Sequence, residues 1–193
     1  MSENQHWPIE QYQLAPREYL AAFGQLTLVY NMLENMIANI FEKIAPFETT
    51  FSRLFFHRLN NRDRIDLLTA VIRKNEKETD TLEALLHCIS SYDICTANRN
   101  ILMHSTYFDT GEDVARFVKR SKNLSEIHFK VSLEELRSVA DDTARTFVYA
   151  VHIFGAISRR QWAEELPESP LLVQMPLLEL PTKIPLPRKL EAE

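Results

Sequence analysis

The scarcity of glycine is the feature that most restricts what this chain can fold into. Its 193 residues include only three glycines, Gly24, Gly111 and Gly155. Tight turns often need a residue with positive φ, which glycine adopts most readily, so an all-β fold with many tight turns is disfavoured. Glycine-rich phosphate loops are excluded too, because neither GxGxxG nor GxxxxGK[ST] can be written with glycines so far apart. The sequence therefore favours a helical protein.

Apolar residues recur at helical spacing along three stretches of the chain. The first predicted helix covers residues 16–44 and carries a continuous apolar stripe. A second helical stretch covers residues 48–75, with an expected break at Asn60-Asn61. The third predicted helix begins near Thr79 or Asp80, both good N-caps, and ends near residue 103. These stretches predict packed helices.

The spacing of apolar residues then changes from helical to alternating. Segments 114–119 and 126–131 alternate apolar and polar residues, and the linker between them contains serines and an asparagine. This pattern predicts a β-hairpin over about residues 113–131. The capping box formed by Ser132 and Glu135 predicts a further helix, which continues to about Trp162.

Together these elements predict an all-α, up-and-down helical bundle with a β-hairpin inserted before its last long helix. Residues 1–166 form the predicted helical domain. Residues 167–193 hold six of the nine prolines and the apolar segment LLVQMPLLELP, so they form a Pro-rich apolar tail. We expect this tail to lie extended, either along the bundle or across a partner subunit.

Cysteine usage and hydropathy indicate a cytoplasmic protein. Cys88 and Cys95 are seven residues apart on one predicted helix, about 10 Å between Cα atoms, which a disulfide cannot span. We expect both to be reduced core residues. No signal peptide is visible at the N-terminus. The longest apolar run, residues 147–157, is too short to cross a bilayer, so no membrane association is expected.

The net charge of −5 disfavours general attraction to nucleic acid, but basic residues are concentrated in two places. Residues 51–74 and residues 113–130 each carry an excess of arginine and lysine. These stretches either form an anion-binding patch or are the solvated faces of a helix and a hairpin.

The segment CTANRNILMHSTY, residues 95–107, ends the third predicted helix with polar residues where aliphatic ones would continue the core. At 100° per residue the helix face starts aliphatic and becomes polar towards its end, through Asp93, Thr96, Asn100 and His104. Arg99 lies on the flank of this face, and its long side chain can reach the same groove. Buried polar groups are unfavourable unless they are hydrogen-bonded. We therefore expect the polar side chains of this face either to have hydrogen-bonding partners or to serve a function.

Each of these residues also has a structural explanation. The imidazole of His104 can complement the dipole at the helix C-terminus, and Asn100 can satisfy a neighbouring helix end. Arg99 can pair with Glu34 or Asp93. Among other side chains, no HExxH motif or paired metal-ligand spacing occurs, so neither a metal nor a cofactor is expected.

The chemistry of the set fits RNA cleavage without a metal. The guanidinium of Arg99 can hold a phosphate and stabilise the pentavalent transition state. His104 can take a proton from the 2′-OH or give one to the leaving 5′ oxygen, and Asn100 can orient either group. One histidine does not easily perform both transfers, so a symmetric dimer that joins two copies of the helix is expected.

The segment RNILMH, Arg99 to His104, resembles the R-x4–6-H motif of the HEPN superfamily, including the polar residue that follows the arginine. The order of elements over residues 17–162 is also similar. The resemblance implies a homodimeric, metal-independent endoribonuclease, often a toxin or a defence protein, that leaves 2′,3′-cyclic phosphate ends. It implies that Arg99 and His104 are catalytic and that Asn100 assists.

Geometry alone adds Asp93, Thr96 and Glu34 as possible supporting residues. The expected partners are an RNA substrate and a second copy of the chain, and an antitoxin or regulatory protein is a further candidate. Inactive HEPN scaffolds exist as well, so the competing hypothesis is a non-catalytic HEPN-fold module that binds a partner protein or a ligand.

Overall fold

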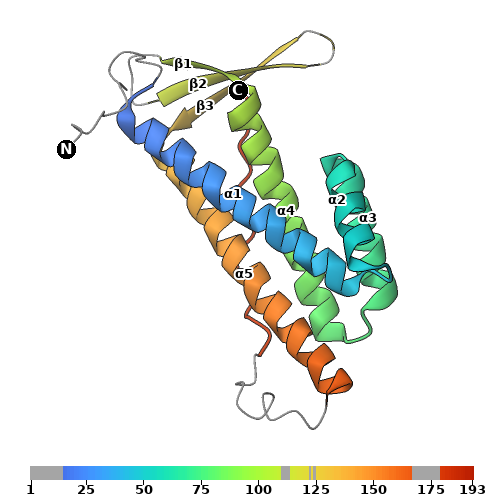
Figure 1. Ribbon diagram of the computed structural model, residues 1–193. Coiled ribbons are helices and arrows are strands. Elements are labelled where there is room, and N and C mark those ends of the chain that lie inside the picture. The colour runs from blue at the N-terminus through green and yellow to red at the C-terminus, as the bar shows by residue number, and fades with distance from the viewer. Residues whose placement is uncertain (1–14, 110–113, 122, 124, 167–178) are drawn as a thin grey trace, which may run out of the picture.

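The computed structural model describes residues 15–109, 114–121, 123, 125–166 and 179–193, to which all structural statements below refer. Within them the chain forms helices and strands in the following order (Figure 1): α1 (Arg17–Ile44), α2 (Thr49–Arg58), α3 (Asn61–Asn75), α4 (Thr79–His104), β1 (Thr106–Asp109), β2 (Val114–Arg120), β3 (Glu126–Ser132) and α5 (Leu133–Glu165).

The long helices α1, α4 and α5 form the body of the protein (Figure 1). α1 and α5 lie side by side over most of their length, α4 packs against both, and α2 and α3 pack on one side of α1 and α4. The apolar stripe predicted for α1 supplies much of the core, through fully buried residues such as Leu33, Ile37 and Ile40. The predicted helical bundle with strands inserted before its last helix is therefore confirmed.

The helix boundaries agree with the sequence patterns at three places, although the N-cap predicted at the third is wrong. The predicted break is present, since Asn60 caps α3 by accepting a 3.0 Å hydrogen bond from the amide of Asp63. The capping box at Ser132 is also present. For α4, however, the predicted caps Thr79 and Asp80 are wrong. The helix begins at Thr79, as predicted, but its N-cap is Glu78, which makes no side-chain hydrogen bond to the helix backbone. The Glu78 carboxylate instead accepts a 2.7 Å hydrogen bond from the hydroxyl of Thr81.

The predicted hairpin is present as β2 and β3, but it is part of a three-stranded antiparallel sheet with the order β1-β2-β3. The strand β1 was not predicted, because its four residues are too short to show a clear alternation. The inner face of the sheet buries Phe117 and Val131 in a second core cluster with Leu26 and Leu136 of the helices. The sheet thus closes the end of the bundle at which α4 ends (Figure 1).

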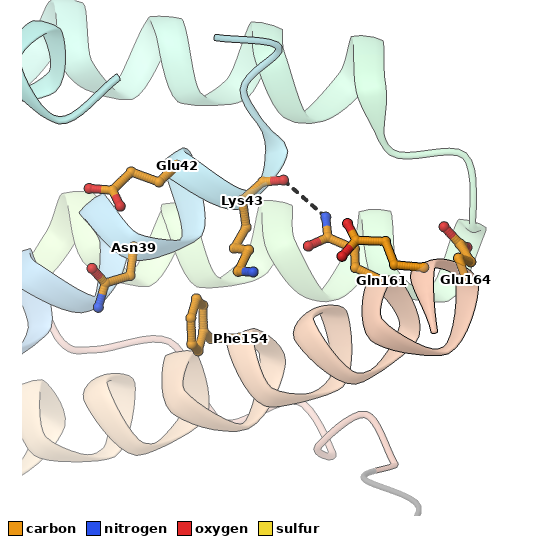
Figure 2. A pocket seen from close by; sticks show the side chains of 7 residues that line it. Asn39, Glu42, Lys43, Phe154, Gln161 and Glu164 are labelled. Atoms are coloured by element: carbon orange, nitrogen blue, oxygen red, sulfur yellow. Dashed lines mark hydrogen bonds between the residues drawn. The ribbon is translucent and has the colours of Figure 1, made fainter. Parts of the chain in front are cut away.

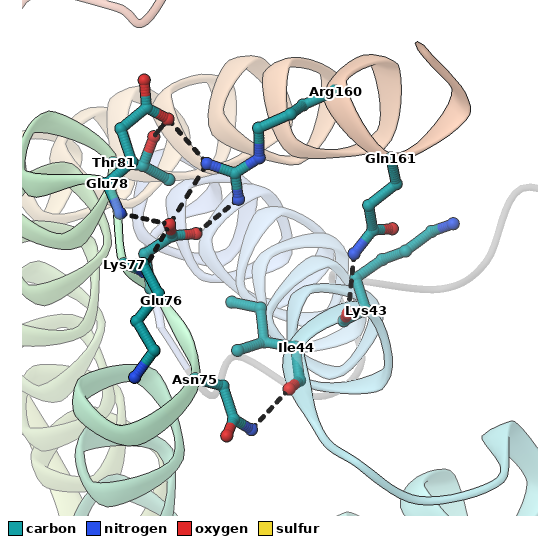
Figure 3. A network of polar contacts seen from close by, with 9 residues as sticks. All are labelled: Lys43, Ile44, Asn75, Glu76, Lys77, Glu78, Thr81, Arg160 and Gln161. Atoms are coloured by element: carbon teal, nitrogen blue, oxygen red, sulfur yellow. Dashed lines mark hydrogen bonds and ion pairs between the residues drawn. The ribbon is translucent and has the colours of Figure 1, made fainter. Parts of the chain in front are cut away.

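A polar network ties the other end of the bundle together (Figure 3). Arg160 of α5 forms ion pairs of 2.6 Å with both Glu76 and Glu78, in the turn between α3 and α4. The helix α1 joins the network through its last carbonyl groups, which accept hydrogen bonds from Gln161 and Asn75. These contacts hold α1, α3, α4 and α5 together at the end of the bundle away from the sheet.

The described part of the tail, residues 179–193, contains no helix or strand and lies along α4 and α5 (Figure 1). The side-chain amide of Asn98 donates to the carbonyl of Arg188 at 2.8 Å and accepts from the amide of Leu190 at 3.0 Å. His87 contacts the carbonyl of Ile184 at 2.8 Å. Of the two paths expected, this part of the tail takes the one along its own bundle. The remaining tail residues, 167–178, lie outside the described residues, as do residues 1–14.

Both cysteines are free and buried, as expected. Burial raises the pKa of the Cys88 thiol to about 12 and also raises the pKa of the Cys95 thiol. Among the described helices, none combines the length and the apolar character that crossing a membrane requires.

The amide of Asn98 is predicted to hold the tail in place. Asn98→Ala removes both hydrogen bonds to the tail backbone, so we expect the free energy of unfolding in urea to fall by about 1–2 kcal/mol. Amide exchange in residues 179–193 should accelerate at the same time. Asn31→Ala, at an exposed position of α1, is the matched control and should change neither quantity. Unchanged exchange in the tail of Asn98→Ala would contradict the role of this amide.

Candidate functional site

The candidate site lies at the C-terminal end of α4, where the helix meets the sheet. His104 is the last residue of the helix, and Ser105 leaves it with an extended backbone, φ −99° and ψ 152°. The strand β1 begins at Thr106, so the sheet starts directly after the site. Arg99 and Asn100 are half-buried, whereas His104 is exposed.

The three residues of the predicted motif are in mutual contact. The guanidinium Nη1 of Arg99 donates a hydrogen bond to Oδ1 of Asn100 at 3.1 Å and lies 3.2 Å from Nε2 of His104. Because a guanidinium has donors only, the second contact is a hydrogen bond when Nε2 is unprotonated and the ring proton is on Nδ1. The expectation that Arg99 leans from its flank towards Asn100 and His104 is therefore confirmed.

The aromatic ring of Tyr30, on α1, packs against the guanidinium of Arg99. The Cζ atom of Arg99 lies 5.2 Å from the centre of the Tyr30 ring, within the range of a cation–π interaction. The hydroxyl of Tyr30 is hydrogen-bonded to the hydroxyl of Thr96 at 3.1 Å, and both residues are buried. Burial is the main reason that the pKa of Tyr30 lies well above its ordinary value. Tyr30 therefore stays neutral and holds its ring beneath Arg99.

A buried arginine, Arg64, is linked to this ring through Tyr92. Tyr30 stacks on Tyr92 of α4, with ring centres 6.3 Å apart, and the Tyr92 hydroxyl accepts a 3.3 Å hydrogen bond from Arg64 of α3. Arg64 also forms an ion pair with Glu34 of α1. Within the described residues, Arg99 forms no ion pair with a carboxylate. Its alternative structural role, pairing with Glu34 or Asp93, is therefore not observed.

Of the three supporting residues suggested by helix geometry, only Thr96 is connected to the site. Thr96 contributes indirectly, through its hydrogen bond to Tyr30. Glu34 pairs with Arg64 and does not contact Arg99. Asp93 is exposed and lies about three helical turns before His104. Neither carboxylate is thus brought to the guanidinium.

Sequence reasoning missed the role of Tyr30. Tyr30 falls within the apolar stripe of residues 16–44, which predicts a core position, and its side chain is indeed buried. The available signal was a buried tyrosine, which needs a partner for its hydroxyl and is often found beside a polar site. Its contact with Arg99 depends on how α1 and α4 are aligned, which the sequence does not show.

The donor set suits phosphate better than a metal ion. Arg99, Asn100 and His104 offer a cation, an amide and an imidazole, with no carboxylate among them. Mg²⁺ and Ca²⁺ prefer carboxylate and carbonyl oxygens. Within the part of the chain that the structure describes, no group of three or more His, Cys, Asp or Glu residues could hold a metal ion.

A cavity of about 570 Å³ lies away from this site, between the C-terminal parts of α1 and α5 (Figure 2). Its lining includes Glu42, Glu164 and Glu165 but only one lysine, Lys43, together with the ring of Phe154. The excess of carboxylates disfavours a phosphate ligand there. The candidate site is instead an open surface at the opposite end of the bundle.

Comparisons with protein-family models, with curated proteins and with solved structures find no match to this chain. The functional argument therefore depends on the residues of the site itself and on the resemblance of their motif.

The ion pair between Glu34 and Arg64 is predicted to stabilise the fold. Glu34→Gln leaves the Arg64 side chain, which is only 7% exposed, without its carboxylate. We expect the free energy of unfolding in urea to fall by about 1–3 kcal/mol. Glu42→Gln is the matched control, because its partner Arg53 is 58% exposed and a surface pair contributes about 0–1 kcal/mol. Equal effects of the two substitutions would contradict this ranking.

Proposed function

We propose that the protein is a metal-independent endoribonuclease of the HEPN type and that Arg99, Asn100 and His104 form its catalytic site. The observation that carries the proposal is the contact of a single guanidinium nitrogen with both Asn100 and the Nε2 atom of His104. A cation, a hydrogen-bonding amide and an imidazole thus meet at one surface, next to the exposed end of a helix.

In the proposed reaction, the 2′ oxygen of RNA attacks the adjacent phosphorus and the bond to the 5′ oxygen breaks. When the phosphate takes over the Arg99 guanidinium, the Nε2 atom of His104 no longer accepts from Nη1, and its lone pair takes the proton of the 2′-OH. Arg99 binds the non-bridging phosphate oxygens and stabilises the charge that develops on them. The products are a 2′,3′-cyclic phosphate and a 5′-OH, with the proton on the leaving oxygen supplied by a second acid.

The second acid in this proposal is His104 of another copy of the chain. Exposed apolar side chains support self-association, because burial of such residues drives most protein–protein contacts. Leu28 and Met32 of α1 are 65% and 49% exposed, and Phe51 and Leu54 of α2 are 54% and 61% exposed. A homodimer that covers part of this surface is therefore part of the proposal.

The cellular role follows only from the resemblance. HEPN endoribonucleases are often toxins or antiviral defence proteins, so we propose such a role here, with an antitoxin or another regulatory protein as a possible partner and the cytoplasm as the compartment. The RNA is the substrate, and no cofactor is required.

A non-catalytic HEPN-fold interaction module is the second candidate, and the tail provides an observation in its favour. Asn98, His87 and Asp142 hold the backbone of residues 184–190 by hydrogen bonds, so the groove between α4 and α5 holds an extended peptide. A protein with such a groove can bind peptides of a partner without cleaving RNA.

Cleavage is predicted to require His104. Wild type should cut a mixed RNA in EDTA, and His104→Ala should lower the rate at least about 100-fold, because general acid–base catalysis contributes about 10²–10⁴-fold. His152→Ala, at an exposed position of α5, is the matched control and should retain full activity. Fragments are scored on a denaturing gel after light scattering has established the oligomeric state.

Absence of cleavage by the intact wild-type dimer would favour the interaction module. Cleavage that persists in His104→Ala would show that a different site, or a contaminating nuclease, is responsible.

Arg99 is predicted to need its forked geometry as well as its charge. Arg99→Lys keeps a cation but loses the planar set of donors that contacts Asn100, His104 and phosphate together. We expect cleavage to fall about 100-fold, with little change in the urea midpoint. Arg145→Lys on α5 is the control. Full activity of Arg99→Lys would show that charge alone is sufficient.

A further inference from the structure

The outer face of the sheet presents a row of one aromatic ring and two basic side chains, with the ring on the edge strand β1. Phe108 of β1 pairs across the sheet with Arg116 of β2, which in turn pairs with Lys130 of β3. Side chains of directly paired residues lie on the same face of a sheet. All three are exposed, and the Phe108 ring is 49% exposed. The helices lie on the other side of the sheet (Figure 1), so this row faces away from the bundle.

A carboxylate of the tail already occupies this basic row. Glu193 forms an ion pair with Lys130, and its backbone amide donates a 3.0 Å hydrogen bond to the carbonyl of His128 on β3. The pKa of Glu193 is lowered, first by its hydrogen bond to Lys130 and further by the charges of Lys130, Arg116 and His128. The positive charges of β2 and β3 therefore favour the ionised carboxylate of Glu193, and Lys130 is the cation in direct contact with it.

Two further basic side chains on this face, among the described residues, lie near a carboxylate. Glu126 lies 3.7 Å from Arg120 and 3.7 Å from His128, at the far end of the hairpin. Arg116 forms no ion pair among the described residues, and its guanidinium is exposed beside Phe108. A phosphate bound here could therefore pair with the guanidinium of Arg116, beside the Phe108 ring.

We propose that this outer face, centred on Phe108, Arg116 and Lys130, binds single-stranded RNA, and that the carboxylate of Glu193 holds the place of a phosphate until RNA displaces it. The choice of RNA rests on the proposed function, whereas the binding itself does not require Arg99 or His104 to cleave.

The chemistry of the face matches a single strand. Unstacked bases bind to exposed aromatic rings, and basic side chains beside the ring bind the phosphates that flank the base. Phe108 can stack on a base, with Arg116 and Lys130 on neighbouring phosphates. A duplex hides its bases and leaves only the phosphate contacts, so it should bind more weakly.

The position of the face explains how it would serve cleavage. Thr106 begins β1 only two residues after His104, so the sheet continues directly from the end of α4. A strand of RNA held on the sheet would thus run towards His104 and Arg99. In this arrangement the sheet would determine where the RNA lies, and the helix end would act on it.

The test measures RNA binding separately from cleavage, in a His104→Ala background and in EDTA. The probes are a short fluorescein-labelled single-stranded RNA of mixed sequence, its duplex and the DNA of the same sequence, with anisotropy recorded over a range of salt concentrations. Phe108→Ala should weaken binding of the single-stranded RNA at least about fivefold. Arg116→Gln and Lys130→Gln should each reduce the salt slope by about 0.7. Glu193→Gln should strengthen binding.

Two controls match these substitutions away from the sheet. Trp162→Ala removes an exposed ring near the end of α5, and Arg73→Gln removes an exposed charge of α3. Both should bind as the background does, and circular dichroism should show every variant folded. Equal losses in Phe108→Ala and Trp162→Ala, or weaker binding by Glu193→Gln, would overturn the proposal. Tighter binding of DNA than of RNA would overturn the choice of RNA.

Because this assay does not involve cleavage, its outcome is independent of the nuclease test. A face that binds RNA beside an inactive Arg99–His104 pair would refute the proposed function alone. Cleavage by a protein whose sheet variants all bind normally would refute the proposed face alone.

Discussion

The burial of Arg64 is the constraint on which the arrangement of the helices depends. A guanidinium only 7% exposed must have all its charge and donors satisfied, since an unpaired buried charge strongly destabilises a fold. Its partners come from three helices and a turn: Glu34 of α1, Tyr92 of α4 and the carbonyl groups of Phe56 and Leu59. These contacts fix α1 against α4. The alignment places Tyr30 beside Tyr92 and beneath Arg99, so the candidate site is supported by contacts that begin at a buried structural arginine.

The fold was largely predictable because its signals are local. The apolar stripe of α1, the Asn60 cap and the capping box at Ser132 each depend on residues a few positions apart, and each is found in the structure. The strand β1 was missed because four residues give too little periodicity, and it forms only when β2 lies beside it. The start of α4 was predicted correctly but its cap was not, because Thr79 is already helical and the capping position falls on Glu78, which makes no side-chain hydrogen bond to the helix backbone.

The site was predictable only in the part carried by one helix. Arg99, Asn100 and His104 are close in sequence, so helical geometry sufficed to bring them together. The contributions of other helices depend on tertiary contacts. Glu34 was expected near the site arginine but pairs with Arg64, which is far from it in sequence, and Tyr30 was assigned to the core alone. The two basic stretches of the sequence also differ in their roles. Arg64, in residues 51–74, is a buried structural residue, whereas Arg116 and Lys130, in residues 113–130, share an exposed sheet face.

In the proposed reaction, Arg99 and His104 cleave RNA by promoting attack of its own 2′ oxygen. The most direct measurement compares an RNA that the protein cuts at one position with the same RNA carrying a single 2′-deoxy nucleotide on the 5′ side of that bond, and determines the fragment ends by mass spectrometry. We expect 2′,3′-cyclic phosphate ends from the first RNA and no cut at that bond in the second. Cleavage of the deoxy-substituted bond, or 5′-phosphate ends from the first RNA, would contradict it.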